Sequence, residues 1–142
     1  MLVRNVTMAE ADQLYPLVCA SARRELPAEV FRVYLSDALS HGTRRILLAL
    51  EGGEAVAYVD AEVRPSLADC ALIGVIHACY VREDCRGHGI GTGLLMSLAT
   101  QFKKLGCVSM TATCARVNVR SQDFLEKRGF TRSQYSFIRD FK

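Results

Sequence analysis

The residues most suggestive of chemistry form a glycine-rich run, Arg86-Gly87-His88-Gly89-Ile90-Gly91-Thr92-Gly93, between a β-rich stretch and an apolar helical stretch. Without Cβ atoms, its glycines let the backbone bend tightly and approach a ligand. Its free N–H groups and the positive end of the following helix dipole would then point at an anion. Four alternating glycines would be an entropically costly way to build an ordinary helix-start turn. The run therefore predicts a phosphate cradle.

Two common nucleotide-binding motifs do not fit this run. A P-loop ends in Gly-Lys-Ser/Thr, and neither residues 89–92 nor residues 91–94 supply the lysine. A dinucleotide fingerprint needs G-x-G-x-x-G and a carboxylate ending a second strand about 20 residues later. The spacing of the run differs from that pattern, and no such carboxylate follows it.

The segment Arg86–Gly91 instead matches R/Q-x-x-G-x-G/A, and it resembles the signature with which the GNAT superfamily of N-acetyltransferases holds the pyrophosphate of acetyl-CoA. Residues 79–84 are similar to the family's strand end Leu-Tyr-Val-x-Pro-Glu, with Glu83 in place of proline. Asn118 and residues 124–130 are similar to the family's Asn and Phe-Tyr-Glu-Lys-Leu-Gly-Phe segment, at the usual interval. The resemblance covers nearly the whole chain and is strongest from Gly74 to Phe130.

The resemblance implies a single N-acetyltransferase domain over residues 1–142 with an α/β (α+β) fold. Its sheet would be mixed, mostly antiparallel and twisted, flanked by about four helices, with a V-shaped splay between two central parallel strands. Acetyl-CoA, as co-substrate, would fill the splay. Backbone amides of Tyr80 and Val81 would meet the pantetheine arm and the thioester, and Asn118 would contact the pantetheine. The implied cofactor-binding set is Cys79, Tyr80, Val81, Arg86, Gly87, His88, Gly89, Ile90, Gly91, Thr92, Asn118 and Phe124.

The usual acid and base of the family are missing from this chain. Acetyl transfer requires an ammonium to lose a proton and the CoA thiolate to be neutralised. The position of a frequent Glu base is Val75, and that of a frequent Tyr acid is Leu125. His77 lies two residues from Val75 and shares its face of the strand if no bulge intervenes.

Several substitutes for the missing groups are open. An imidazole suits a base at neutral pH, although His77 could equally be a hydrogen-bonded strand histidine without chemistry. Tyr80, Cys79 and Tyr135 are candidates for protonating the thiolate. Proximity alone, with water relaying the proton, is a further alternative. The candidate catalytic set is His77, Tyr80 and Tyr135.

The acceptor is suggested by four short segments, Phe31–Val33, Leu47–Leu50, Ile73-Gly74 and Arg132–Phe137, which are loosely similar to the aminoalkylphosphonate N-acetyltransferase subfamily. That similarity implies a small primary amine with an anionic group, gripped by Arg32 or Arg64, because guanidinium groups suit phosphonate and carboxylate. The candidate substrate-binding set is Arg32, Tyr34, Val75 and His77. A protein N-terminus or lysine is an alternative acceptor. A non-catalytic acetyl-CoA-binding or regulatory module is an alternative function.

Composition and length limit the classes of partner that the protein is expected to bind. A chain of 142 residues makes one domain, and no apolar stretch approaches the roughly 20 residues that span a bilayer. We expect a cytoplasmic protein without membrane or nucleic-acid partners, since the net charge of +3 is mild and scattered. The six cysteines are expected to be buried small hydrophobes, and three isolated histidines predict no metal site. A homodimer is possible through a terminal strand beginning near Tyr135.

The elements that position these residues can be inferred from capping, turn and periodicity signals. A capping box at residues 7–10 should start a helix with Ala11, Leu14, Leu17 and Val18 inward. A helix from Pro27 to about Ser40 should bury Val30, Val33, Tyr34 and Leu39. The remaining predictions are strands at 2–6, 45–50, 55–63, 73–81 and 107–113, a hairpin at 52–53, a loop at 65–66, helices at 90–105 and 118–128, and one or two strands within 130–141.

Overall fold

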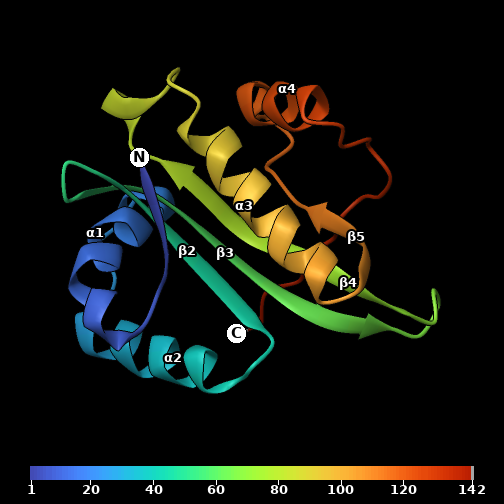
Figure 1. Cartoon of the computed structure of the whole chain (residues 1–142), viewed down its shortest axis with the longest axis horizontal. Coiled ribbons are helices and arrows are strands. Elements are labelled where there is room, and N and C mark those ends of the chain that lie inside the picture. The colour runs from blue at the N-terminus through green and yellow to red at the C-terminus, as the bar shows by residue number, and fades with distance from the viewer. Residues whose placement is uncertain (142) are drawn as a thin grey trace.

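The computed structural model describes residues 1–141, in which five strands and four α-helices follow the expected order as far as α4 (Figure 1). Two short 3₁₀ turns, Met8–Glu10 and Glu83–Cys85, precede α1 and α3. The helices are α1 Ala11–Ala22, α2 Ala28–Ser40, α3 Ile90–Lys104 and α4 Val119–Lys127; the strands are β1 Leu2–Asn5, β2 Arg44–Glu51, β3 Glu54–Ser66, β4 Ala71–Val81 and β5 Cys107–Ala112.

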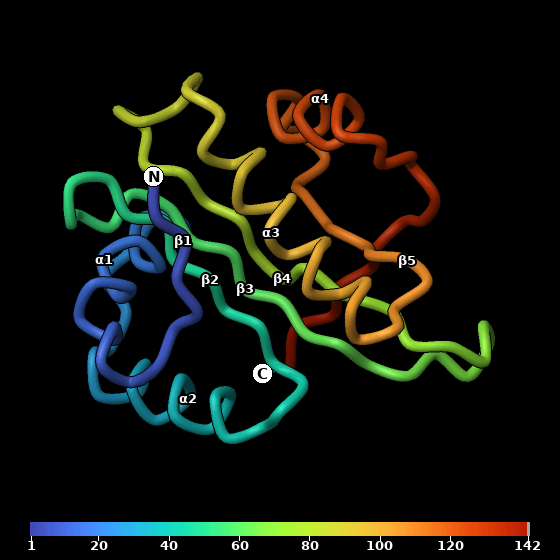
Figure 2. Tube along the Cα trace, in the orientation of Figure 1, coloured from blue at the N-terminus to red at the C-terminus, as the bar shows by residue number. Residues whose placement is uncertain are grey.

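The strands form one mixed sheet in the order β1-β2-β3-β4-β5. The first four are joined by antiparallel pairings, and β5 runs parallel to β4. Helices α1 and α2 lie on one side of the sheet, and α3 and α4 lie on the other (Figure 1). The tube trace shows the N-terminus beside the beginning of α3 (Figure 2). This arrangement confirms the predicted mixed, mostly antiparallel sheet.

Each face of the sheet has its own apolar core. On the face of α3, alternate residues of β3 (Ala57, Val59, Ala61) pack against Leu94, Leu98 and other buried side chains of the helix. On the opposite face, Leu48 and Tyr58 pack against Leu14 and Leu17 of α1 and Leu35 of α2. The two-residue period of the strands thus supplies both cores at once.

Several local signals act as expected. Thr7 and Glu10 form the complete capping box, with the Thr7 amide donating to Glu10 Oε1 at 2.9 Å. Gly52 and Gly53 have positive φ angles of 58° and 81°, which the tight β2–β3 turn requires. Gly106 follows the end of α3 with φ 90°. These positions fix where α1, the hairpin and α3 begin or end.

The splay that the resemblance implied is present. Pairing between β4 and β5 runs from Leu72 with Cys107 to Ile76 with Ala112, and β4 continues to Val81 beyond it. Residues 77–81 therefore pair with β3 on one side but lack a β5 neighbour on the other. This unpaired outer edge of residues 77–81 is called the opening of the splay.

Other predictions are corrected by the structure. Residues 130–141 form no strand, so β5 is an edge strand rather than a central one. Pro65 and Ser66 belong to β3, because that strand pairs with β4 as far as Ser66 opposite Ala71. None of the six cysteines is fully buried: Cys70, Cys79 and Cys114 are exposed, and the other three are half-buried.

The buried face of α2 also differs from the prediction. Val30, Val33 and Tyr34 are exposed, Tyr34 by 70%, whereas Leu35 and Ala38 are buried. Two overlapping apolar stripes run along this helix, and the one that includes Leu35 packs against the sheet. Periodicity alone could not choose between them because both have helical spacing.

Candidate active site

The glycine-rich run forms a turn that opens α3. Gly87 and Gly89 adopt positive φ angles of 84° and 81°, which side chains other than glycine rarely tolerate, and Gly89 is the N-cap of the helix. Within residues 1–141, the backbone amides of residues 87–92 donate no hydrogen bond. A helix N-terminus with several unused amides fits a phosphate group.

Gly91 and Gly93 serve packing rather than turning. A Cβ at Gly91 would lie 3.1 Å from the Phe124 ring and 3.4 Å from Val81, so its absence lets α4 and the end of β4 approach α3. A Cβ at Gly93 would lie 2.5 Å from Met1 Cε. Phe124, predicted as a cofactor contact, therefore lies against the cradle helix.

Arg128 is a site residue that the sequence analysis did not identify. Its Nε and Nη2 donate to the Thr92 hydroxyl at 2.9 and 2.6 Å, and its guanidinium stacks over the Phe124 ring at 4.3 Å from the centroid. A cation is thereby held beside the unused amides of the cradle. Its place in the segment 124–130 gave no signal of this role, because the contact joins residues 36 positions apart.

At the end of β4, two backbone amides face the opening. Arg82 donates its amide to the Val56 carbonyl of β3 at 2.8 Å. Residues alternate along an antiparallel pair, so Tyr80 also turns its amide toward β3, whereas Cys79 and Val81 turn theirs away from it. Of the two amides expected to meet acetyl-CoA, that of Val81 is directed to the opening and that of Tyr80 is not.

Arg86 closes the turn between β4 and the cradle. Its Nε donates to the Val81 carbonyl at 2.9 Å, and its guanidinium lies over the Tyr80 ring at 5.4 Å. His88, the second residue after it, is exposed, with Nδ1 3.3 Å from the Cys85 carbonyl. Arg86 therefore ties the strand end to the cradle.

Cys79 lies on the same strand end. Although the residue is exposed beside the opening, the protein around its thiol disfavours the charged form and raises the pKa to about 11. The group is therefore a neutral thiol at physiological pH and a poor nucleophile.

Asn118 is the N-cap of α4. Its Oδ1 accepts from the Ser121 amide at 3.1 Å, which leaves the side-chain NH₂ available to a ligand. A single residue thus starts the helix that carries Phe124 and keeps a donor free.

His77 is paired with Glu62 on β3. His77 Nε2 and Glu62 Oε1 are 2.9 Å apart, and both side chains are partly exposed, by 36% and 28%. Val75 lies opposite Glu62, and His77 is itself the extra residue of a bulge, because Ile76 pairs with Ala61 and Ala78 with the adjacent Asp60. The contact with Glu62, which is the residue opposite Val75, places the His77 side chain on the same face as Val75 in spite of the bulge.

A pocket of about 330 Å³ opens on the same side of the sheet, between α1, α2, β2 and β3. It is mainly apolar, with Phe31, Tyr34 and Tyr58 among its lining residues. Arg44 and Asp60 form a bidentate ion pair on its wall at 2.7 and 2.9 Å, and this hydrogen bonding raises the pKa of Arg44. The pair neutralises the charge of both groups.

Two predicted site residues lie apart from this arrangement. Arg32 Nη1 is bound to Asp12 Oδ1 at 3.0 Å, in an exposed ion pair between α1 and α2. Tyr135 is 85% exposed in the segment after α4. Leu125, at the position of the family's usual acid, packs against the core on the α3 side.

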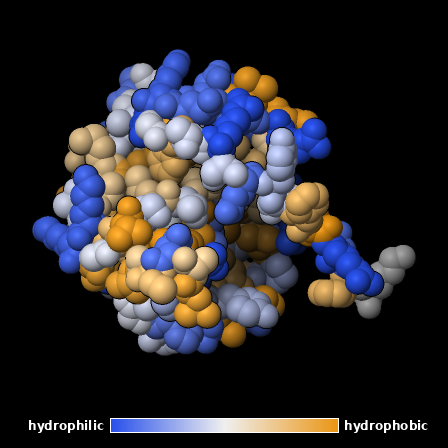
Figure 3. Space-filling model, turned by 90° about the vertical axis from the view of Figure 1, so that its right-hand side faces the viewer, coloured by the Kyte–Doolittle hydropathy of each residue, from blue (hydrophilic) through white to orange (hydrophobic). Residues whose placement is uncertain are grey.

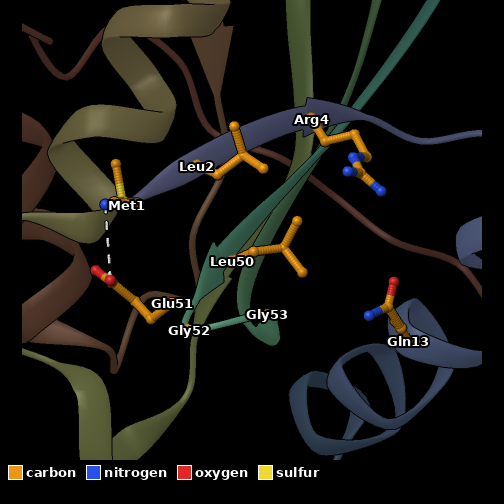
Figure 4. Close-up of a pocket in the computed structure, with 8 residues that line it drawn as sticks. All are labelled: Met1, Leu2, Arg4, Gln13, Leu50, Glu51, Gly52 and Gly53. Atoms are coloured by element: carbon orange, nitrogen blue, oxygen red, sulfur yellow. Dashed lines mark ion pairs between the residues drawn. The ribbon is translucent and has the colours of Figure 1, made fainter.

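A second hollow, of about 470 Å³, lies beside the β2–β3 turn (Figure 4). The N-terminal ammonium is 3.7 Å from Glu51, and Arg4 on β1 and Gln13 on α1 point toward one another across it. None of the predicted cradle or acid-base residues lines this hollow. Its position therefore does not link it to the chemistry at the end of β4.

Two further properties concern metals and membranes. In the described part of the chain, no group of three or more His, Cys, Asp or Glu side chains is placed to hold a metal ion. No helix within residues 1–141 combines the length and the apolar character needed to cross a bilayer.

Comparisons with known proteins agree with the fold. The acetyltransferase (GNAT) family matches residues 11–130. An aminoalkylphosphonate N-acetyltransferase of Salmonella typhimurium is 26% identical over 140 residues, which cover 96% of this chain and 89% of that protein.

Solved structures share the architecture at lower identity. Aminoglycoside N-acetyltransferase AAC(6')-Iy in complex with CoA superposes with a TM-score of 0.89 at 16% identity, over 99% of this chain and 94% of the other. A ribosomal-protein-alanine N-acetyltransferase of Brucella melitensis biovar Abortus gives 0.84 at 20% identity, over 99% and 100%. With this fold, this cradle and a family match over most of its length, the chain belongs to the acetyltransferase (GNAT) family and is an N-acetyltransferase.

Proposed function

We propose that the protein transfers the acetyl group of acetyl-CoA to the primary amine of a small molecule, by direct attack within a ternary complex. The observation that carries the proposal is the junction of the open end of β4 with the cradle at the start of α3. The amides of Cys79 and Val81 face the opening. The unused amides of residues 87–92 follow in the sequence, after the 3₁₀ turn Glu83–Cys85. This order of donors suits a thioester, a pantetheine arm and a pyrophosphate in succession.

The residues around the cradle would hold the pyrophosphate. Backbone N–H groups supply most of the contacts, and the Arg128 guanidinium adds a positive charge beside Thr92. The Thr92 hydroxyl accepts both Arg128 hydrogen bonds, so its own proton remains available to a phosphate oxygen. Asn118 would use its free NH₂ on the pantetheine.

His77 would remove the proton from the acceptor ammonium. Glu62 is an acceptor for the hydrogen on Nε2, and in a neutral imidazole this arrangement leaves the lone pair on Nδ1. Nδ1 is therefore the basic atom, and Glu62 orients the ring and stabilises the charge it acquires, as a carboxylate does in a hydrolase triad. Tyr58 and Asp60 alternate with Glu62 on β3 and line the pocket on the α1–α2 side, so the pair faces the side where the acceptor would enter.

The acetyl transfer then consists of bond formation, bond cleavage and proton transfer. The neutral amine nitrogen attacks the thioester carbonyl carbon, and a C–N bond forms. The C–S bond breaks, and its electron pair leaves with sulfur. The surplus proton on nitrogen reaches the thiolate through Tyr80 or water, while the first proton passes from His77 to solvent. Cys79 is a poorer proton donor than an ordinary cysteine, because desolvation raises the pKa of its thiol to about 11.

The acceptor is best matched by a small amine that also carries an anionic group. Glu62 and Arg64 occupy alternate positions on β3 and so share one face, about 7 Å apart along the strand. The His77–Glu62 pair, which receives the amine, and a guanidinium that attracts a phosphonate or carboxylate fit the two ends of such a molecule. Arg64 replaces Arg32 in this role, since Arg32 is bound to Asp12. The aminoalkylphosphonate activity of the Salmonella relative points the same way.

A protein N-terminus or lysine is the second acceptor candidate, and the fold it shares with the ribosomal-protein-alanine N-acetyltransferase favours it. A peptide would need an extended groove across the α1–α2 side. The pocket of about 330 Å³ in that region has a size that fits a compact side chain or small molecule. The small amine is therefore preferred.

The experiment is release of CoA thiol from acetyl-CoA with a panel of aminoalkylphosphonates, amino acids, polyamines and peptides with free N-termini. Turnover that depends on a small zwitterionic amine supports the proposal, and Arg64→Ala should raise the KM for that amine while leaving the KM for acetyl-CoA unchanged. Turnover on peptides alone would mean that the acceptor is a protein and not a small amine. Saturable acetyl-CoA binding without turnover on any amine would mean that the protein is a non-catalytic acetyl-CoA-binding module.

A further inference from the structure

Arg82 joins two separate segments of the chain just beyond the end of β4. Its Nε and Nη2 donate to the two carboxylate oxygens of Asp84 at 2.6 and 3.1 Å, and its Nη1 donates to Glu54 Oε1 at 2.7 Å. Glu54 is the first residue of β3, and Asp84 lies in the 3₁₀ turn Glu83–Cys85. One guanidinium therefore connects the beginning of β3 to the turn that precedes the cradle.

The backbone of Arg82 is fixed as well. Its amide donates to the Val56 carbonyl at 2.8 Å, and its carbonyl accepts from the Cys85 amide at 2.9 Å. Arg82 thus ends the pairing with β3 and starts the turn. All three guanidinium nitrogens and both backbone polar groups of this residue are engaged, so its side chain and the turn hold one another in place.

The network around Arg82 is stronger in its local effect than in its effect on the whole fold. Hydrogen bonding to Arg82 lowers the pKa of the Asp84 carboxyl, so the pair is charged at neutral pH. The side chains of Glu54 and Asp84 are 69% and 67% exposed, and exposed ion pairs add little to global stability. Bidentate geometry nevertheless restricts the direction of the two partners. The network is therefore suited to shaping the turn.

This turn separates the two groups of amides that the proposed function assigns to acetyl-CoA. The amides of Cys79 and Val81 precede it, and those of residues 87–92 follow it. A ligand that contacts both groups binds more weakly when the connection between them must first be ordered. The shape of the turn thus decides whether both groups of donors are in place before the ligand arrives.

The turn contains no residue that restricts its backbone covalently. Glu83 stands where the similar strand ends carry proline, and within residues 1–141 its side chain forms no hydrogen bond or ion pair. The position could accept proline, because Glu83 is the first residue of the 3₁₀ turn and the preceding Arg82 has a ψ of 136°. The Glu83 amide also donates no hydrogen bond in the described chain.

We infer that Arg82 is a positioning residue for acetyl-CoA: by binding Asp84 and Glu54, it holds the turn in the shape that keeps the amides of the strand end and of the cradle ready for one ligand. The inference rests on the proposed binding of acetyl-CoA at the cradle. Arg82 acts through the backbone of residues 83–86 and restricts the turn by ion pairing, as a proline ring would restrict it covalently.

The first test is the Kd for CoA, measured by isothermal titration calorimetry. Arg82→Ala should raise this Kd about tenfold, which corresponds to ordering about one backbone residue on binding. Asp84→Ala should also raise it, although this variant removes a negative charge near an anion site. Electrostatic attraction alone predicts the opposite sign for Asp84→Ala. Unchanged or tighter CoA binding by either variant would overturn the inference.

A proline provides the second test. Glu83→Pro, added to Arg82→Ala, should recover about two- to fivefold of the lost affinity, because the ring restricts the backbone of residue 83. Glu83→Ala on the same background is the matched control, since it removes the same carboxylate without restricting φ. This control should leave the Kd raised. Equal Kd values for the two double variants would contradict a role of Arg82 in shaping the turn.

Hydrogen exchange of the unliganded protein tests the turn without any ligand. The Cys85 and Arg86 amides, which donate to the carbonyls of Arg82 and Glu83, should exchange faster in Arg82→Ala and more slowly again when Glu83→Pro is added. Unchanged exchange in Arg82→Ala would overturn the inference and leave the proposed function intact. A wild-type protein without saturable CoA binding would overturn the proposed function and the inference with it.

Arg132→Ala is the control for loss of an exposed ion pair. It breaks the pair of Arg132 with Glu126, whose nitrogen and oxygen are 2.9 Å apart and whose side chains are 70% and 46% exposed. The segment after α4, to which Arg132 belongs, ends away from the body at the right of Figure 3. This variant should alter neither the Kd for CoA nor the exchange of the Cys85 and Arg86 amides. A loss of CoA affinity equal to that of Arg82→Ala would mean that the effect is not specific to the turn, which would also overturn the inference.

Discussion

At the scale of single residues, the pairing of His77 with Glu62 determines what the acid-base chemistry can be. The sequence identified His77 by its distance from Val75, but it could not identify Glu62, which is 15 positions away and meets His77 only through the β3–β4 register. The position of the bulge was equally hidden. His77 is the extra residue of that bulge, and its two neighbours Ile76 and Ala78 pack against opposite cores.

Replacing Glu62 should distinguish its role in orienting the His77 ring from any role in binding acetyl-CoA. Glu62→Gln removes the carboxylate that holds the hydrogen on Nε2, so kcat should fall in the same direction as in His77→Ala, for which a loss of about 10²-fold or more is expected of a general base. KM for acetyl-CoA should not change, because neither residue touches the cradle. Steady-state kinetics on the preferred amine measure both. Glu62→Asp should recover part of kcat, and a wild-type kcat in Glu62→Gln would remove Glu62 from the mechanism.

Cys79 provides a test of the environment at the strand end. With a pKa of about 11, roughly one Cys79 thiol in a thousand is ionised at pH 8, against about one in four for a cysteine at the ordinary value near 8.5. Since the thiolate is the reacting form, iodoacetamide should modify the exposed Cys70 and Cys114 well before Cys79. The Cys79 rate should rise as the pH is raised toward 11. Peptide mass spectrometry over time gives the three rates, and equal rates at pH 8 would contradict the predicted desolvation.

At the scale of elements, most of the chain could be predicted because its signals are local. The capping box at Thr7, the glycine pair of the hairpin and the glycine after α3 each act within four residues. The predictions that were wrong concern elements whose structure depends on a partner far away in the sequence. On α2, the stripe of Phe31, Leu35 and Ala38 faces the protein interior because Phe31 packs edge-on against Tyr15 of α1, with the ring centroids 5.2 Å apart. The strands expected in residues 130–141 have suitable residues but no partner strand within the described chain.

The packing of α3 on β4 depends on a glycine in the strand. A Cβ at Gly74 would lie 2.3 Å from Phe102 Cδ2 and 2.9 Å from Cγ, and Phe102 is buried to 2% exposure. The clash reaches the base of the ring, so a change of rotamer cannot relieve it and helix and strand must separate. We expect Gly74→Ala to lower the free energy of unfolding by about 1–3 kcal/mol.

Urea denaturation of the Gly74→Ala protein measures this loss. Gly42→Ala is the matched control, because no atom lies within 4 Å of a Cβ at Gly42 and its φ is not positive. The control should change stability by no more than about 0.5 kcal/mol. A Gly74→Ala protein as stable as the control would mean that α3 does not pack on β4 as described.

At the scale of the whole molecule, the fold brings three distant segments to one place: the strand end at 79–81, the turn at 86–92, and α4 with Asn118, Phe124 and Arg128. The sequence predicted the first two and part of the third from motif spacing. Arg128 was missed because its contacts with Thr92 and Phe124 exist only after α4 has packed across Gly91. The cradle is thus a product of tertiary packing as well as of its own glycines.

A ligand that joins these segments should stabilise the folded state as a whole. Binding to the native state alone adds about 2.7 kcal/mol when the ligand is at 100 times its Kd, so CoA should raise Tm by several degrees in a thermal unfolding scan. Pantetheine, which lacks the pyrophosphate, should raise Tm much less at equal concentration, because the amides of residues 87–92 then stay unused. Arg128→Ala should lower the shift caused by CoA and leave the shift caused by pantetheine unchanged. Arg120→Ala, which removes an exposed arginine from the same helix, should alter neither. Equal shifts with CoA and pantetheine would mean that the glycine turn does not hold the pyrophosphate, whatever the enzyme's activity.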